Sequence, residues 1–188
     1  MVLKVRLRLT STLFPILESF FMSVSSSSVH IRRTVPGDGK WIKPFIVKYW
    51  GAEKVIAHGT VFYPHTLQGF AAIQKDEKIG LVTFYLKDDY CEIVTLNSIR
   101  PHTGVGSRLV EAVKKAAGQA GCKRLWLITT NDNINALRFY QKRGFELAAL
   151  HRNALDLSRK LKPEIPLTGD HGIPLRDEIE LEIRLIEK

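Results

Sequence analysis

Two glycines, Gly104 and Gly106, stand between an apolar run and a helical pattern, an arrangement that can bind phosphate. The first backbone N–H groups of a helix have no acceptor within the helix, and together with the helix dipole they attract anions. Glycine has no Cβ that would block close approach of the backbone to the anion. We therefore predict that residues 104–107 form a pyrophosphate cradle, to which Arg100 and Arg108 can add charge. Because Gly-x-Gly alone is a weak signal, a plain strand-to-helix turn is the alternative.

The patterns around this turn predict the elements that must hold it. Apolar runs over residues 91–96 and 125–128 predict two buried strands. Between them, apolar residues recur at helical spacing from Leu109 to Ala120, which predicts a helix with one buried face. A second helix is predicted over residues 133–143, ended by Gly144, because glycine is common just past a helix C-terminus.

The motifs of this stretch resemble those of the GNAT superfamily of N-acetyltransferases. That family carries Gln/Arg-x-x-Gly-x-Gly/Ala at the start of its central helix, and further along Asn-x-x-Ala-x-x-x-Tyr followed by Gly-Phe. The matching residues here are Gly104, Val105, Gly106, Asn133, Ala136, Tyr140, Gly144 and Phe145. The sequence departs from the family at the first motif position, which is Pro101 here, with an arginine one place earlier.

The resemblance implies an α/β fold of the GNAT type, in which one mixed sheet of about seven strands is flanked by three to five helices. It also implies acetyl-CoA as cosubstrate, bound in part by the backbone of the first buried strand. The residues that we expect to bind it are Val94, Thr95, Leu96, Arg100, His102, Thr103, Gly104, Val105, Gly106, Ser107, Asn133 and Ala136.

Acetyl transfer requires that the thioester be held, the amine deprotonated and the thiolate reprotonated. By resemblance, Tyr140 gives a proton to the thiolate; the alternative is a core aromatic residue. By the same resemblance, Asn133 contacts the cofactor arm. It could also cap the helix, with Asp132 as a rival cap, and both roles of Asn133 can hold together.

The amine also needs a base, because a lysine-like amine of pKa about 10.4 is mostly protonated at neutral pH. Glu92 is the candidate, since alternation along a strand would place Glu92, Val94 and Leu96 on one face. The alternative is an ordinary polar residue on the solvated side of the strand. Weaker candidates are Tyr90, Asn97, His58 and His65.

The remaining sequence gives the order of elements and one ambiguous segment. Residues 29–35 predict a first strand, and the apolar spacing from Trp41 to Tyr49 predicts a helix capped by Asp38 or Gly39. Residues 51–68 indicate a loop or a short helix. Strands are predicted over 69–74 and 80–86, then 145–150 after the central stretch, with a short helix over 154–161, a loop over 162–175 and a last antiparallel strand over 177–186.

Composition narrows the function further. The net charge is +9, which fits either attraction to an anionic ligand such as a nucleotide cofactor or a merely basic surface. The six histidines show no ligand spacing, so we expect no metal, and the full GxGxxG of a dinucleotide-binding site is absent. The two cysteines form no CxxC pair and indicate free thiols in a reducing, cytoplasmic setting.

These observations lead to one expected activity and two rivals. We expect an acetyl-CoA-dependent N-acetyltransferase whose second substrate is a small-molecule or peptide amine. The rivals are a non-catalytic acyl-CoA-binding domain and a basic nucleic-acid-binding protein, the latter disfavoured because no aromatic and basic cluster is visible. No membrane partner is expected, since no apolar run reaches the length of a membrane span. A homodimer is left open.

Residues 1–28 differ in composition from the rest and end in four serines. Pro15 and Glu18 interrupt their apolar stretch, which argues against a signal peptide. We interpret them as a disordered extension, with Met22 as an alternative start, although a transit peptide also fits their basic, hydroxyl-rich composition. Residues 29–188 are then the acetyltransferase domain.

Overall fold

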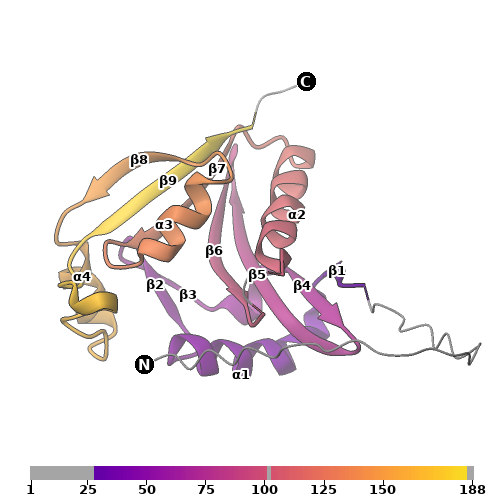
Figure 1. Ribbon diagram of the computed structural model, residues 1–188, viewed down its shortest axis with the longest axis horizontal. Coiled ribbons are helices and arrows are strands. Elements are labelled where there is room, and N and C mark those ends of the chain that lie inside the picture. Colours follow the sequence, from indigo (N-terminus) through magenta and orange to yellow (C-terminus); the bar gives the residue numbers. More distant parts are fainter. Residues whose placement is uncertain (1–27, 101–102, 186–188) are drawn as a thin grey trace, which may run out of the picture.

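A seven-stranded mixed sheet runs through the structure, a computed structural model that describes residues 28–100 and 103–185 (Figure 1). Its strand order is β1-β4-β5-β6-β7-β9-β8. The strands are β1 (His30–Arg33), β4 (Gln68–Gln74), β5 (Glu77–Lys87), β6 (Tyr90–Ser98), β7 (Arg124–Thr130), β8 (Glu146–His151) and β9 (Glu178–Arg184). With the four α-helices of the described residues, this confirms the predicted mixed α/β sheet.

One pair of neighbouring strands, β6 and β7, is parallel, and the other described pairs of this sheet are antiparallel. A parallel pair needs a crossover connection, and helix α2 (Val105–Gln119) supplies it. Strand β9 lies between β7 and β8, so the last strand of the described chain is an interior strand of the sheet and not an edge strand. The predicted antiparallel pairing of this strand is confirmed.

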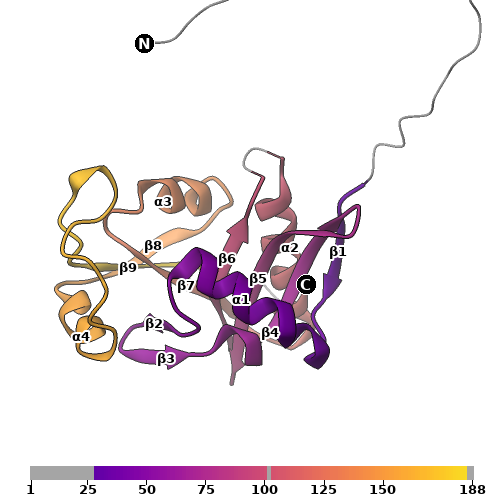
Figure 2. The same cartoon turned by 90° about the horizontal axis from the view of Figure 1, so that it is seen from below.

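Each face of the sheet has its own hydrophobic core. On one face α2 and helix α3 (Ile134–Gln141) pack through residues such as Leu109, Val113 and Tyr140. On the other face, helix α1 (Gly39–Trp50) packs through Ile42 and Ile46. Helix α4 (Ala154–Leu161) lies beside the hairpin described next (Figures 1 and 2).

Residues 51–68 form neither a plain loop nor an α-helix, which corrects the prediction. They contain a hairpin of β2 (Val55–Ala57) and β3 (Thr60–Phe62), followed by a 3-10 turn over Pro64–Thr66. The two strands pair only with each other, outside the main sheet. Because each has three residues, neither is long enough for alternation to be visible in the sequence.

Asp38 precedes α1 as predicted, but its side chain does not cap the helix. Its carboxylate accepts hydrogen bonds from the Arg32 guanidinium at 2.7 Å for each of two nitrogens, from Val35 N at 2.8 Å and from Trp41 Nε1 at 2.7 Å. Through these hydrogen bonds the buried Asp38 links Arg32 of β1 to Trp41 in the first turn of α1. The bond from Arg32 is the largest of the effects that hold the pKa of Asp38 well below its ordinary value.

We expect Asp38→Asn to lower the free energy of unfolding by about 2–3 kcal/mol at pH 7, the usual value of hydrogen bonds to a charged group. Because the folded-state pKa is depressed, the ionised carboxylate stabilises the protein above the ordinary pKa of about 3.9, and this stability is lost as pH falls. Urea denaturation from pH 7 to pH 3 should therefore show a shrinking difference between parent and variant. The exposed Asp88→Asn is the control, and an equal loss there would contradict the assignment.

Among the described residues, no helix combines the length and apolar character needed to cross a membrane.

Candidate functional site

Strands β6 and β7 part at the centre of the sheet. They pair over residues 90–93 and 124–127, after which β6 continues beside β5 and β7 continues beside β9. A pocket of about 330 Å³ lies at this fork. Its lining includes six of the predicted site residues: Val94, Thr95, Leu96, Asn133, Ala136 and Tyr140. The structure thus brings together two motifs that lie far apart in the sequence.

A β-bulge at the fork overturns one prediction about β6. Thr95 faces Thr83 on β5 and Ile93 faces Phe84, so Val94 is the extra residue without a partner. The extra residue shifts the alternation of side chains. Val94 consequently packs in the α1 core, whereas Leu96 packs against the α2 core. The predicted common face for Glu92, Val94 and Leu96 is therefore wrong, because strand alternation assumes an unbroken register.

The position of Tyr140 is compatible with both interpretations of its role, a core aromatic residue and a proton donor. Its ring packs edge-on against Phe139 and Phe145, at centroid distances of 5.0 and 5.3 Å. The side chain also lines the fork pocket, and its hydroxyl has no hydrogen-bond partner among the described residues. Burial raises the pKa of Tyr140 well above its ordinary value, so the phenol stays protonated at neutral pH. A protonated phenol facing a pocket can donate to a bound group.

Asn133 is the cap of α3, as predicted. Its Oδ1 accepts a hydrogen bond from Ala136 N at 3.0 Å. The rival assignment to Asp132 is wrong, because Asp132 Oδ2 accepts from Asp170 N at 2.8 Å. Asp132 therefore fastens the loop over residues 162–175, confirmed here as largely irregular, to the end of β7 beside the fork.

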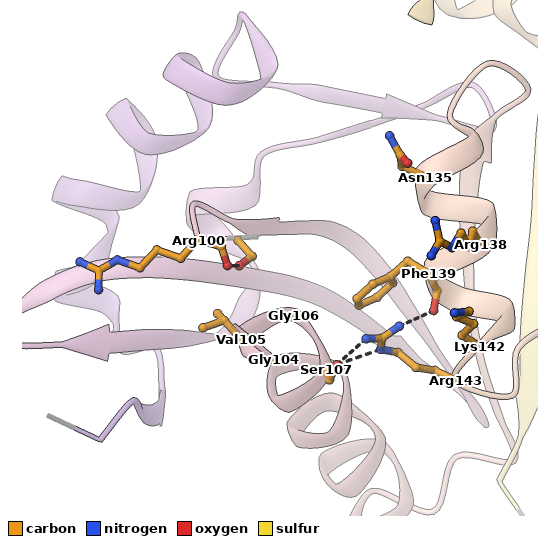
Figure 3. Close-up of a pocket in the computed structure, with 11 residues that line it drawn as sticks. Arg100, Gly104, Val105, Gly106, Ser107, Asn135, Arg138, Phe139, Lys142 and Arg143 are labelled. Carbon is orange, nitrogen blue, oxygen red and sulfur yellow. Dashed lines mark hydrogen bonds between the residues drawn. The ribbon is translucent and has the colours of Figure 1, made fainter. Parts of the chain in front are cut away.

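A second and larger pocket, of about 680 Å³, lies between the start of α2 and the outer face of α3 (Figure 3). The predicted cradle, residues 104–107, forms one wall. The other wall is lined by Arg138 of α3 and by Lys142 and Arg143, which directly follow the helix. Within the described part of the chain, Arg138 and Lys142 form no ion pair, which leaves their charges available to an anion.

Arg143 joins the two walls of this pocket. Its guanidinium donates to Ser107 Oγ, at 3.1 Å from Nε, and to the carbonyl oxygen of Phe139 at 2.6 Å (Figure 3). It also lies over the Phe139 ring, 3.5 Å from the centroid. Sequence reasoning missed these basic residues, because charges on a helix are usually a solvated face. The available signal was the four-residue spacing of Arg138 and Lys142 beside the tyrosine motif.

Arg100 also lines this basic pocket, but its charged end is paired elsewhere. Its guanidinium binds Gln74 and Glu77 at the β4–β5 hairpin, and its side chain points away from α3 (Figure 3). Thr103 Oγ1 donates to the carbonyl oxygen of Arg100 at 2.7 Å. His102, another predicted binding residue, lies outside the described residues.

The two glycines of the cradle serve different purposes. Gly104 has a φ of +79°, the left-handed conformation that favours glycine, and no atom lies within 4 Å of where a Cβ would be. A Cβ at Gly106 would instead meet the Phe139 ring at 3.2 Å. The predicted reason for Gly106, direct approach of an anion, is therefore incomplete, because this glycine also lets α2 pack against α3.

Glu92 is 2 % exposed, so the interpretation as a solvated polar residue is wrong. Its Oε1 lies 3.0 Å from Nε2 of His58, in the turn of the β2–β3 hairpin. The pair lies on the face of the sheet opposite α2 and α3. Over the described residues, no group of three or more His, Cys, Asp or Glu side chains is arranged to hold a metal ion.

Comparison with known proteins identifies relatives of this chain. The sequence model of the Acetyltransferase (GNAT) family matches residues 40–145, more than half of the chain. The uncharacterized protein YxbD of Bacillus subtilis (strain 168) is 41% identical over 141 residues, which cover 74% of this chain and 89% of YxbD. The uncharacterized protein YdhI of the same organism is 43% identical over 136 residues, or 72% of this chain and 85% of YdhI.

Solved structures share the fold at low sequence identity. A Bacillus subtilis acetyltransferase in complex with CoA superposes with a TM-score of 0.59 at 20% identity, over 85% of this chain and 100% of that one. A GNAT family acetyltransferase from Elizabethkingia anophelis with acetyl-CoA bound superposes with a TM-score of 0.59 at 22% identity. The match covers 84% of this chain and 98% of that one. Because the family model matches more than half of the chain, and the fold agrees with it, the chain belongs to the GNAT family of acetyltransferases.

Proposed function

We propose that this protein is an acetyl-CoA-dependent N-acetyltransferase that acetylates a primary amine by direct attack in a ternary complex. The observation that carries the proposal is the fork, where the predicted cofactor residues of β6 and α3 line one pocket. The neighbouring basic pocket suits the phosphates of CoA. Two structural relatives contain CoA or acetyl-CoA, which supports the choice of acetyl donor.

Separate parts of the chain would hold separate parts of acetyl-CoA. The N-terminal N–H groups of α2 and the side chains of Arg138 and Lys142 would bind the phosphates. Beyond the last β6–β7 pair, the backbone of residues 94–96 has no partner on β7, so its polar groups can bind the pantetheine arm and polarise the thioester carbonyl. Asn133 keeps its amide nitrogen for the same arm while its oxygen caps α3.

The proton donor and the basic group lie on opposite faces of the sheet at the fork. Tyr140 belongs to the core on the α2 and α3 face and would give its proton to the departing thiolate. Glu92 lies on the opposite face, where it pairs with His58, and the proton of the amine would be removed on that face. Separation of the two roles lets the amine approach the thioester from the side away from the cofactor, as direct attack requires.

The test is a panel of small-molecule and peptide amines, scored by release of the free CoA thiol from acetyl-CoA. Release that depends on one class of amine supports the proposal, and mass spectrometry of the product locates the acetyl group on nitrogen. Binding of acetyl-CoA without release for any amine would instead indicate a non-catalytic acyl-CoA-binding domain. The matched control is Tyr140→Phe, in which the pocket is retained but the proton donor is lost.

A further inference from the structure

His58 and Glu92 form a hydrogen-bonded pair that joins the β2–β3 hairpin to the sheet. The distance from His58 Nε2 to Glu92 Oε1 is 3.0 Å. The Glu92 side chain is 3 % exposed, whereas the His58 side chain is 31 % exposed, so the imidazole is the member that solutes can reach. Since an ionised carboxylate only accepts hydrogen bonds, Nε2 carries the proton and Nδ1 carries the lone pair. Nδ1 lies 3.3 Å from the hydroxyl of Thr60.

The backbone that holds His58 is strained. His58 and Gly59 form the two-residue turn of the hairpin, with φ values of +41° and +72°. Residues other than glycine are uncommon in this conformation, although histidine, like asparagine and aspartate, adopts it more often than most. Strain of this kind persists only where the surrounding structure fixes it, and it gathers at functional sites. The conformation of His58 therefore depends on the contacts that hold the turn.

Two other elements fix the turn in place. The backbone N–H of His58 donates to Oε2 of Glu178, a carboxylate of β9 that is 2 % exposed. Ser158 of α4 donates to the other oxygen of Glu178 at 3.4 Å. Leu157 covers Gly59 so closely that a Cβ there would lie 2.7 Å from its Cδ2. One buried carboxylate thus holds the backbone of His58 and another holds its ring.

The pair lies at the start of the fork. Glu92 immediately precedes Ile93, which belongs to the last pair between β6 and β7 and lines the fork pocket. The His58 ring packs against Trp126, opposite Glu92 on β7, with 5.4 Å between centroids. Nε1 of Trp126 is buried and has no hydrogen-bond partner among the described residues. An unpaired buried donor beside the pair suits a site that is completed by a bound molecule.

We propose that His58 is the base of the reaction and that Glu92 acts through it as the carboxylate that orients the imidazole. This rests on the proposed function. Nδ1 of His58 takes one proton from the ammonium form of the acceptor, whose freed lone pair attacks the thioester carbonyl carbon. The C–N bond forms and the C–S bond breaks. Tyr140 gives its proton to the departing sulfur, and the second proton of the nitrogen then passes to the Tyr140 oxygen. The imidazolium then releases its proton to water.

Acid strength favours the imidazole over the carboxylate as the proton acceptor. An ordinary glutamate has a pKa of about 4.3 and an ordinary histidine about 6.5, so histidine is closer to an amine of about 10.4. The bond to Glu92 raises the pKa of His58 further. The titratable groups that act on His58 are Glu92 from β6 and Glu178 from β9, and His151 of β8 acts in turn on Glu178. The neighbouring α4 contributes the hydroxyl of Ser158, which does not titrate in this range.

The test compares His58→Asn and Glu92→Gln with the parent, using an amine from the panel. Asparagine tolerates the left-handed backbone, so the turn should be retained. We expect kcat/KM of His58→Asn to fall about 100-fold at pH 7 with unchanged acetyl-CoA affinity, the lower end of general base catalysis. The parent's rise of kcat/KM with pH, as His58 loses its proton, should disappear in this variant. An unchanged rate and pH profile would overturn the assignment.

A matched control and a second measurement separate this proposal from the proposed function. His151 forms a similar pair with Glu180, at 3.1 Å, so His151→Gln should keep the parental rate and an equal loss there would overturn the proposal. Titration of the His58 resonance by NMR needs no acceptor. We expect its midpoint above about 6.5 in the parent and lower in Glu92→Gln. No thiol release from any amine, with this midpoint shift intact, would overturn the enzymatic function but leave the pairing established.

Discussion

Gly106→Val should lower the affinity for CoA at least about 100-fold, or about 2.7 kcal/mol of binding free energy. The Cβ of residue 106 would meet the Phe139 ring at 3.2 Å, and valine adds two methyl groups beyond it. Phe139 lines the basic pocket and lies under the Arg143 guanidinium, so its displacement would disturb both walls of that pocket. Because the contact is also between helices, the free energy of unfolding should fall by about 1–3 kcal/mol. Calorimetry with CoA and thermal unfolding measure the two effects.

The matched control is Gly118→Val on the same helix. A Cβ at Gly118 meets no atom within 4 Å, and its backbone is helical. Valine is a better helix former than glycine, so this variant should bind CoA like the parent and be slightly more stable. A folded Gly106→Val protein with parental CoA affinity would show that the cofactor phosphates bind elsewhere.

Tyr140→Phe should lower kcat about ten- to a thousand-fold, within or just below the usual range for general acid catalysis. The substitution removes the hydroxyl but keeps the edge-on packing with Phe139 and Phe145. The affinity for acetyl-CoA should change little, because the lost interaction matters mainly as charge develops on sulfur. Steady-state kinetics with an acceptor from the panel, together with calorimetry, separate the two quantities.

Tyr85→Phe on β5 is the control, since this tyrosine is 40% exposed and is not among the residues that line the fork pocket. It should keep the parental kcat. If Tyr140→Phe also turned over the acceptor at the parental rate, Tyr140 would be only a core aromatic residue. The proton of the thiolate would then come from another source, most simply water.

Local patterns were sufficient to predict most of the elements. The buried face of α2 follows from its apolar spacing, and Gly144, with a φ of +82°, follows α3 as the predicted stop. The hairpin around His58 could not be predicted, because its short strands carry no period and its turn has histidine at a left-handed position. The bulge at Val94 was also hidden, since an extra residue in one strand depends on its partner strand.

The sequence by itself was sufficient to predict the family, the glycine turn at the start of α2 and the residues of α3 that line the fork pocket, because each is encoded in a short stretch with fixed spacing. Tertiary structure decided where the charges lie. Arg100 pairs with Glu77, Arg143 donates to Ser107, and Glu92 is buried against His58. The residues of each pair are 23 or more positions apart in the chain, so only the packing of the sheet and its helices could select these partners. The candidate base, His58, could therefore be singled out only from the structure, in which the β2–β3 hairpin lies against the sheet.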